Sequence, residues 1–165
     1  MKMPTLVAAA AIAMTTAAAT AGGPRIWSGY DFEYDHPFSM APADYITPNV
    51  GIQRSNIRGI FNEASETLYV DGVSPADTEW AFGTTADWDT LTYADWKTAI
   101  GANPPLSIGQ NMVVHLISDD IYLDIRFTGW GSIGSGAFSY VRAVPTPGTA
   151  AIFGAAGLAM TRRRR

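Results

Sequence analysis

Two runs of β-favouring residues, 112–118 and 121–128, are separated only by Asp119 and Asp120. This pattern predicts an antiparallel hairpin with these two aspartates as its loop. Every opposite pair on one face is then apolar, which directs that face toward a core. The pairs are Leu116 with Leu123, Val114 with Ile125, and Met112 with Phe127. Adjacent aspartates are poor type I′ turn residues, so a wider loop over 118–121 is an open alternative.

The other face of the predicted hairpin sets His115 opposite Asp124. A histidine beside a carboxylate is the arrangement of a catalytic base and its orienting group, and Ser118 or Ser139 would then be the nucleophile. No nucleophile elbow or similar local motif accompanies the pair. A cross-strand hydrogen bond or ion pair explains it better, so we do not predict an enzyme.

Alternation of residue types continues outside the hairpin. Aromatic residues at positions 30, 32 and 34 alternate with acidic residues at 31, 33 and 35, as in a half-buried strand. Further strands are expected in the ranges 50–53, 59–61, 79–83 and 137–142. Prolines make 36–49 a loop, and 87–100 fits a short helix or irregular cover. We therefore expect an all-β antiparallel sandwich of jelly-roll type.

Charge and composition limit the partners of this domain. The chain has 11 basic and 15 acidic residues, but Lys2 and the four terminal arginines lie outside 22–143. Six basic residues then face all 15 acidic ones, a net charge of −9. Such a domain repels polyanions, so no nucleic-acid partner is expected. Cysteine is absent, which excludes a disulfide framework, a thiol nucleophile and a zinc knuckle.

The acidic pair at the hairpin tip is the best metal candidate in the sequence. Asp119 and Asp120 supply carboxylate oxygens, which are the hard ligands that calcium prefers. Aspartates are also common in turns, where they make local hydrogen bonds and are well solvated. We therefore predict no metal and no other cofactor, with calcium at these two residues as the alternative.

Tryptophans are numerous for a domain of this size. Exposed indoles on a sheet would form a platform on which sugar rings stack, which makes carbohydrate binding the alternative function. A cysteine-free β core also needs large aromatic side chains, which favours burial of most of them. The residues concerned are Trp27, Trp80, Trp88, Trp96 and Trp130.

Residues 1–21 have the pattern of a secretory signal peptide. Lys2 precedes an apolar stretch at 6–14, and Ala19-Thr20-Ala21 matches the Ala-x-Ala pattern of a cleavage site. Cleavage is expected after Ala21, with a second candidate site at 17–19. An uncleaved anchor is disfavoured because the apolar stretch is too short to span a bilayer comfortably.

The last 22 residues combine a two-proline motif, an apolar run at 150–160 and a basic end. A helix over 149–161 would be about 20 Å long, short of the ~30 Å hydrocarbon core, so it suits a transient span. Arginines hold such a span with its end on the cytoplasmic side. The motif is Val144, Pro145, Thr146, Pro147, Gly148 and Thr149, and the basic end is Arg162, Arg163, Arg164 and Arg165.

This tail resembles the PEP-CTERM sorting signal of bacterial surface proteins, in a Val-Pro-x-Pro-Gly-Thr variant that has Thr146 where the name-giving form has Glu. The resemblance implies recognition by an exosortase, a membrane-embedded cysteine transpeptidase, and cleavage near 145–147. It also implies a cell-surface setting, such as a biofilm, with extracellular polysaccharide as a partner. Residues 115–122 and 136–140 resemble parts of the β-sandwich domains that such proteins carry.

The sequence thus predicts three parts: a signal peptide at 1–21, a β-sandwich domain at 22–143 and a sorting tail at 144–165. The expected function is that of an exported cell-surface or extracellular-matrix protein, structural or adhesive in type, anchored transiently in the inner membrane by its tail. A carbohydrate-binding module is the alternative, and a hydrolase centred on His115 and Asp124 is the least favoured reading.

Overall fold

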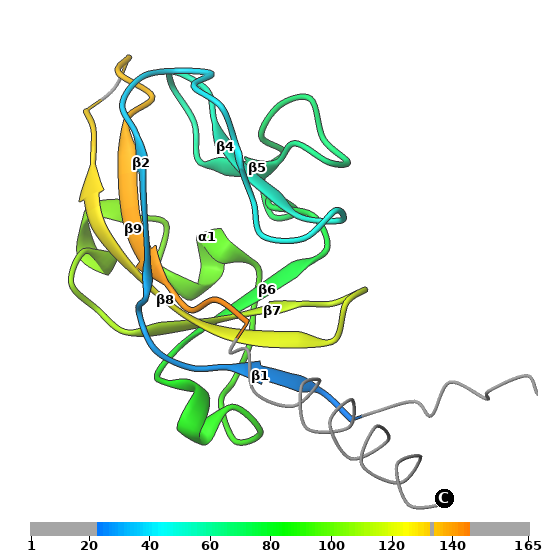
Figure 1. Cartoon of the computed structure of the whole chain (residues 1–165). Coiled ribbons are helices and arrows are strands. Elements are labelled where there is room, and N and C mark those ends of the chain that lie inside the picture. Colours follow the sequence, from blue (N-terminus) through cyan, green and yellow to red (C-terminus); the bar gives the residue numbers. More distant parts are fainter. Residues whose placement is uncertain (1–22, 133, 146–165) are drawn as a thin grey trace, which may run out of the picture.

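The computed structural model describes residues 23–132 and 134–145. The predicted signal peptide and residues 146–165 of the predicted sorting tail lie outside this part of the chain. The described residues form an all-β fold with two sheets (Figure 1). The strands are β1 (Arg25–Trp27), β2 (Phe32–His36), β3 (Asp44–Tyr45), β4 (Gly51–Arg54), β5 (Ile60–Asn62), β6 (Thr78–Phe82), β7 (Met112–Leu116), β8 (Ile121–Trp130) and β9 (Phe138–Arg142).

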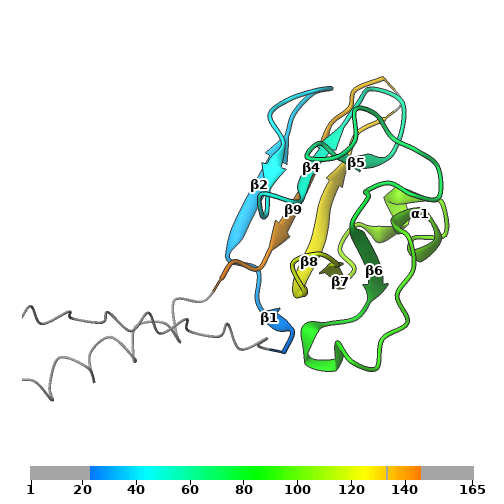
Figure 2. The same ribbon diagram turned by 90° about the vertical axis from the view of Figure 1, so that its right-hand side faces the viewer.

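The larger sheet has six strands and is organised around β8. Its main order is β2-β9-β8-β7-β6, and these pairs are antiparallel. The short β1 runs parallel to the first part of β8, whereas β9 pairs with the part from Ile125 onward. Trp27 therefore lies opposite Leu123, and the Ala143 amide donates to the carbonyl of Asp124 at 2.9 Å. The first strand and the segment after β9 thus contact neighbouring residues of β8, and both lie at the same end of the domain (Figure 2).

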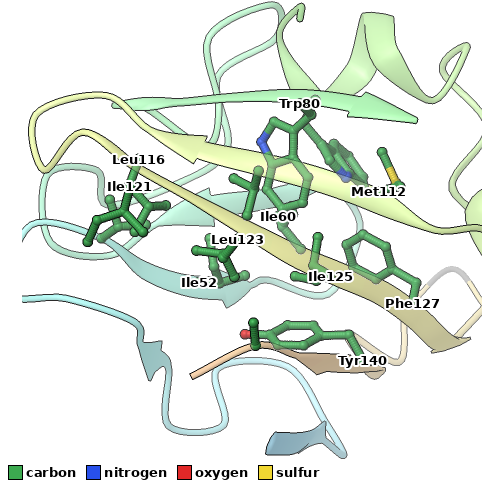
Figure 3. Packing of buried hydrophobic residues seen from close by; sticks show 14 of the residues in the cluster. Ile52, Ile60, Trp80, Met112, Leu116, Ile121, Leu123, Ile125, Phe127 and Tyr140 are labelled. Carbon is green, nitrogen blue, oxygen red and sulfur yellow. The ribbon is translucent and has the colours of Figure 1, made fainter. Parts of the chain in front are cut away.

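The smaller sheet, β3-β4-β5, shares one apolar core with the larger sheet. In Figure 3, Ile52 and Ile60 of the smaller sheet point into the same space as Leu123 and Ile125 of β8. This follows from the period of two in a strand, which puts alternate side chains on the same face. The largest fully buried side chains include Trp80, Tyr140, Phe61, Phe127, Phe138, Met112, Leu116 and Ile121.

The predicted hairpin is present, but its register differs from the prediction. Val114 lies opposite Leu123 and Leu116 opposite Ile121, so each partner is shifted by two residues. The loop is wider than two residues, as the alternative expected, but it covers 117–120 and not 118–121. Asp120 adopts a positive φ of 50°. A shift of two residues keeps the same side chains in the core, because side chains alternate with a period of two.

The other predicted strands are found as β2, β4, β5, β6 and β9. The segment 36–49 is not wholly a loop, because His36 ends β2 and Asp44–Tyr45 form β3. The undecided segment 87–100 contains one turn of helix, α1 (Trp96–Ala99). Two 3₁₀ turns, η1 (Thr85–Asp87) and η2 (Pro104–Ser107), flank it. The cap of α1 is Asp95, whose carboxylate accepts the Thr98 amide at 3.1 Å.

A buried ion pair joins the two sheets. Asp44 of β3 accepts two hydrogen bonds from the Arg142 guanidinium of β9, at 2.7 and 2.8 Å. The Tyr140 hydroxyl donates to the same carboxylate at 2.6 Å, and the Phe32 ring lies 4.4 Å below the guanidinium. Asp44 and Arg142 are 7% and 6% exposed. Both charges have lost their water, so each depends on the other.

Removing one partner of this ion pair should destabilise the fold strongly. We expect Asp44→Asn to lower the free energy of unfolding by about 3–5 kcal/mol, because Arg142 would remain buried without a counter-charge. Urea denaturation followed by tryptophan fluorescence measures this cost. Glu33→Gln, on the exposed side of β2, serves as a control and should change stability by less than about 0.5 kcal/mol. Equal costs for the two variants would contradict the assignment.

Alkaline pH should weaken the same cluster. Burial, and then the neighbouring Asp44 charge, raise the pKa of Tyr140 well above its ordinary value of 10.0. Its neutral form is therefore favoured in the folded state, so its contribution is complete below pH 10 and is lost as the pH rises beyond 10. Stability should fall by about 1.4 kcal/mol per pH unit for this group. Tyr140→Phe should show a shallower decline in urea titrations at pH 9–11.5, and an unchanged slope would contradict the prediction.

Candidate functional site

His115 lies on the outer face of the larger sheet, but its partner is not Asp124. Its Nδ1 is 2.8 Å from Glu79 Oε1 on the adjacent β6. Its ring stacks on Tyr122 with centroids 3.9 Å apart and planes 2° from parallel. The predicted His115–Asp124 pair is wrong because the register shift sets His115 opposite Tyr122. The hydrolase hypothesis thereby loses its central contact.

Asp124 has a structural role. Its carboxylate accepts the Thr85 amide at 2.7 Å, the Thr85 hydroxyl at 3.0 Å and the Gly29 amide at 3.0 Å. The side chain is 6% exposed. It therefore ties the β1–β2 turn and the η1 turn to β8, and these three donors replace the water lost on burial.

The two serines considered as nucleophiles lie in other hydrogen bonds. Ser118 donates to the Asp77 carboxylate at 2.8 Å, and Ser139 accepts from the Thr128 hydroxyl at 2.9 Å. Nε2 of His115 is buried without a hydrogen-bond partner in the described residues and lies 3.5 Å from Asp120 Oδ1. Among 23–132 and 134–145, neither histidine forms a hydrogen bond with a serine.

The acidic loop tip is engaged in hydrogen bonds with the chain itself. The Asp119 carboxylate accepts from the Thr47 hydroxyl and, at 3.1 Å, from the Asn49 amide. Asp120 turns instead toward His115. In the described part of the chain, no three His, Cys, Asp or Glu side chains are grouped to hold a metal ion. Calcium at Asp119 and Asp120 stays the alternative prediction.

The five tryptophans do not form one platform. Trp80, Trp96 and Trp27 are buried, at 0%, 2% and 9% exposed, so their faces are not open to a sugar. Trp88 and Trp130 are half-buried. Trp88 packs on Tyr122 near the start of β8, and Trp130 ends that strand, roughly 27 Å farther along it.

A β-bulge brings Trp130 into a surface pocket. The register of β8 against β9 shifts between Phe127 and Gly129, which turns Trp130 toward the core side. There it stacks against Trp96 with centroids 5.4 Å apart, and the Arg54 guanidinium lies 3.9 Å from its ring centroid. The pocket has a volume of about 310 Å³, near the lower end for small-molecule sites.

Basic residues surround this pocket. Its lining includes Arg54, Arg58 and Lys97, with Asp71 as its one carboxylate. Sequence reasoning missed the site because its residues come from segments far apart in the chain. A signal was present, since three of the six basic residues in 22–143 lie within 54–97.

The predicted sorting motif lies almost wholly outside the described residues. Val144 is half-buried and Pro145 is exposed, immediately after the fully buried Ala143. Residues Thr146, Pro147, Gly148, Thr149 and Arg162 to Arg165 are not described. Within 23–132 and 134–145, no helix has the length and apolar character needed to cross a membrane.

The chain was also compared with known proteins. No family model, curated protein or solved structure matches it.

The role of Asp124 can be tested against that of Glu79. Asp124→Ala should lower the free energy of unfolding by about 2–4 kcal/mol, because it leaves the buried donors of Thr85 and the half-buried amide of Gly29 without an acceptor. Glu79→Ala should cost about 1 kcal/mol or less, since its carboxylate is 38% exposed. Thermal and urea unfolding measure both values. A larger cost for Glu79→Ala would reverse the assignment.

Proposed function

We propose that the protein is an exported component of the cell surface or extracellular matrix, structural or adhesive in type. In this proposal residues 1–21 direct export, and an exosortase-like transpeptidase recognises the tail 144–165 in the inner membrane. The proposal rests mainly on the tail, in which a two-proline motif, an apolar run and four arginines follow one another. No catalytic role is assigned to the β-domain.

The geometry of the domain supports this proposal. Ala143, the residue before the motif, is fully buried and hydrogen bonded to β8, whereas Pro145 is exposed. A processing enzyme would thus find an accessible, proline-extended segment beside a domain that ends just before it. Cutting near 145–147 would remove no core residue. The domain would then remain folded after processing.

Two finer predictions accompany the proposal. Two sheets that share one core are the arrangement of a sandwich domain, and the jelly-roll form of that sandwich stays a prediction.

The net charge of −9 in 22–143 suits a soluble exported domain. Extracellular polysaccharide stays the proposed surrounding material, and nucleic acid is not a proposed partner.

Removal of the tail should change where the protein goes without unfolding it. We expect a chain lacking 144–165 to be exported but neither processed by an exosortase nor retained at the surface. Cell fractionation with immunoblotting measures the distribution in a bacterium that has an exosortase. Mass spectrometry of the mature full-length product should place its ends near residue 22 and at 145–147.

A milder variant separates recognition from the loss of a hydrophobic segment. Replacing Pro145 and Pro147 by alanine leaves the apolar run and the four arginines intact, so membrane entry should continue while cleavage stops. The uncut precursor should then accumulate in the membrane fraction, as it should for the unaltered chain in a strain without exosortase. The proposal fails if all these chains distribute alike.

A further inference from the structure

We propose that the pocket between the β4–β5 turn, α1 and the end of β8 binds a carboxylate-bearing sugar ring, a uronic acid. Its walls combine the cations of Arg54, Arg58 and Lys97 with the aromatic rings of Tyr69 and Trp130. The proposal goes beyond the sorting function and does not depend on it, because every residue involved belongs to the β-domain.

The charge of the pocket is opposite to that of its surroundings. The lining has three cations and one carboxylate, a net charge of +2. Residues 22–143 as a whole have a net charge of −9, so the rest of the domain carries −11. The negative charge outside the pocket would repel a dense polyanion. A single carboxylate bound in the pocket would instead lie close to its three cations. The charge pattern therefore favours a single anionic unit.

The buried charge of Arg54 is the strongest argument that the ligand is an anion. It is 3% exposed and has no carboxylate partner among the described residues. Its Nε donates to the Arg58 carbonyl at 3.0 Å, and Nη1 donates to the Ala137 carbonyl at 2.5 Å. Burial lowers its pKa to about 10, so it remains charged at neutral pH. Carbonyl groups fix the guanidinium in place without neutralising it, and an incoming carboxylate would supply the missing charge.

Two further cations stand at the rim. Arg58 is exposed, and its side chain makes no hydrogen bond or ion pair to another described residue. The Lys97 ammonium is 2.7 Å from the Asp71 carboxylate, an exposed contact of little strength. Asp71 also accepts from the Tyr69 hydroxyl at 3.0 Å. A ligand carboxylate would compete with Asp71 for Lys97, and it would also share the charge of Arg58 with Asp71.

The shape and lining of the pocket are the reason for proposing a sugar ring as the ligand. A Cβ on Gly59 would lie 2.5 Å from Trp96 Cζ3 and 2.7 Å from Tyr69 Cε2. The glycine at this position therefore lets the rings of Trp96 and Tyr69 pack closely against the backbone of residue 59. Trp130 also lines the pocket, where the Arg54 guanidinium and the Trp96 ring pack against it. The faces of aromatic rings attract the C–H groups of a sugar, and the volume of about 310 Å³ suits one sugar ring.

NMR of the full chain in non-ionic detergent tests this proposal with glucuronate as the probe. The five indole N–H signals, assigned through Trp→Phe variants, report where binding occurs. Glucuronate should shift the signals of Trp96 and Trp130 with millimolar affinity and leave Trp88 unchanged. Glucose, acetate and benzoate should each bind at least about tenfold more weakly, because each lacks either the charge or the sugar ring.

Matched charge variants distinguish this pocket from general attraction of anions. Arg58→Gln should weaken glucuronate binding at least about fivefold. Arg126→Gln makes the same charge change beside Tyr30, outside the pocket, and should alter affinity less than about twofold. Asp71→Asn should strengthen binding, an effect that loss of folding cannot produce. The four terminal arginines are common to all these chains, so they do not contribute to the differences.

Each remaining outcome counts against the proposal. Equal binding of glucose would make the site one for neutral sugars, and equal binding of benzoate would make it one for aromatic acids. Equal binding of acetate, or equal effects of Arg58→Gln and Arg126→Gln, would reduce it to unspecific charge attraction. Absence of shifts at Trp96 and Trp130 would overturn the site altogether. None of these results bears on the sorting proposal, which fractionation tests separately.

Discussion

Burial of one face of β8 is the constraint on which the structure depends. Ile121, Leu123, Ile125 and Phe127 lie on that face and are at most 1% exposed. The smaller sheet packs over them, while β1, β7 and β9 pair with the strand edges. The opposite face carries Asp124, which ties two turns to the sheet. One strand thus positions the core and both ends of the domain.

The sequence predicted most of the described strands, though not β1 and β3, because alternation is a local property. It identified the inward side chains of β7 and β8 correctly even though the register was wrong, since a shift of two residues preserves the faces. Register depends on the loop, and the loop is fixed by distant contacts. Ser118 bonds to Asp77, and Asp119 to Thr47 and Asn49. Periodicity within the hairpin carries no information about these partners.

The same limit explains which side chains were misassigned. The pairing of His115 with Asp124 was predicted from the hairpin of β7 and β8 alone. Its hydrogen bond is instead with Glu79 on β6, which lies 36 residues earlier in the chain. The pocket was missed because it requires the bulge after Phe127 to turn Trp130 inward, and a bulge has no signature in this sequence beyond Gly129. Burial of Trp27, Trp80 and Trp96 follows the general need of a β core for large apolar side chains.

Two buried arginines differ in how their charges are balanced within the fold. Arg142 is held by two hydrogen bonds to Asp44, so its charge is neutralised inside the fold. Arg54 is equally buried but is held by carbonyl groups, which bear no net charge. A second internal carboxylate would have satisfied Arg54 as Asp44 satisfies Arg142, in a domain that has 15 acidic residues. The acidic domain instead leaves a fixed positive charge beside an aromatic pocket, and this uncompensated charge is the reason for proposing an anionic ligand there.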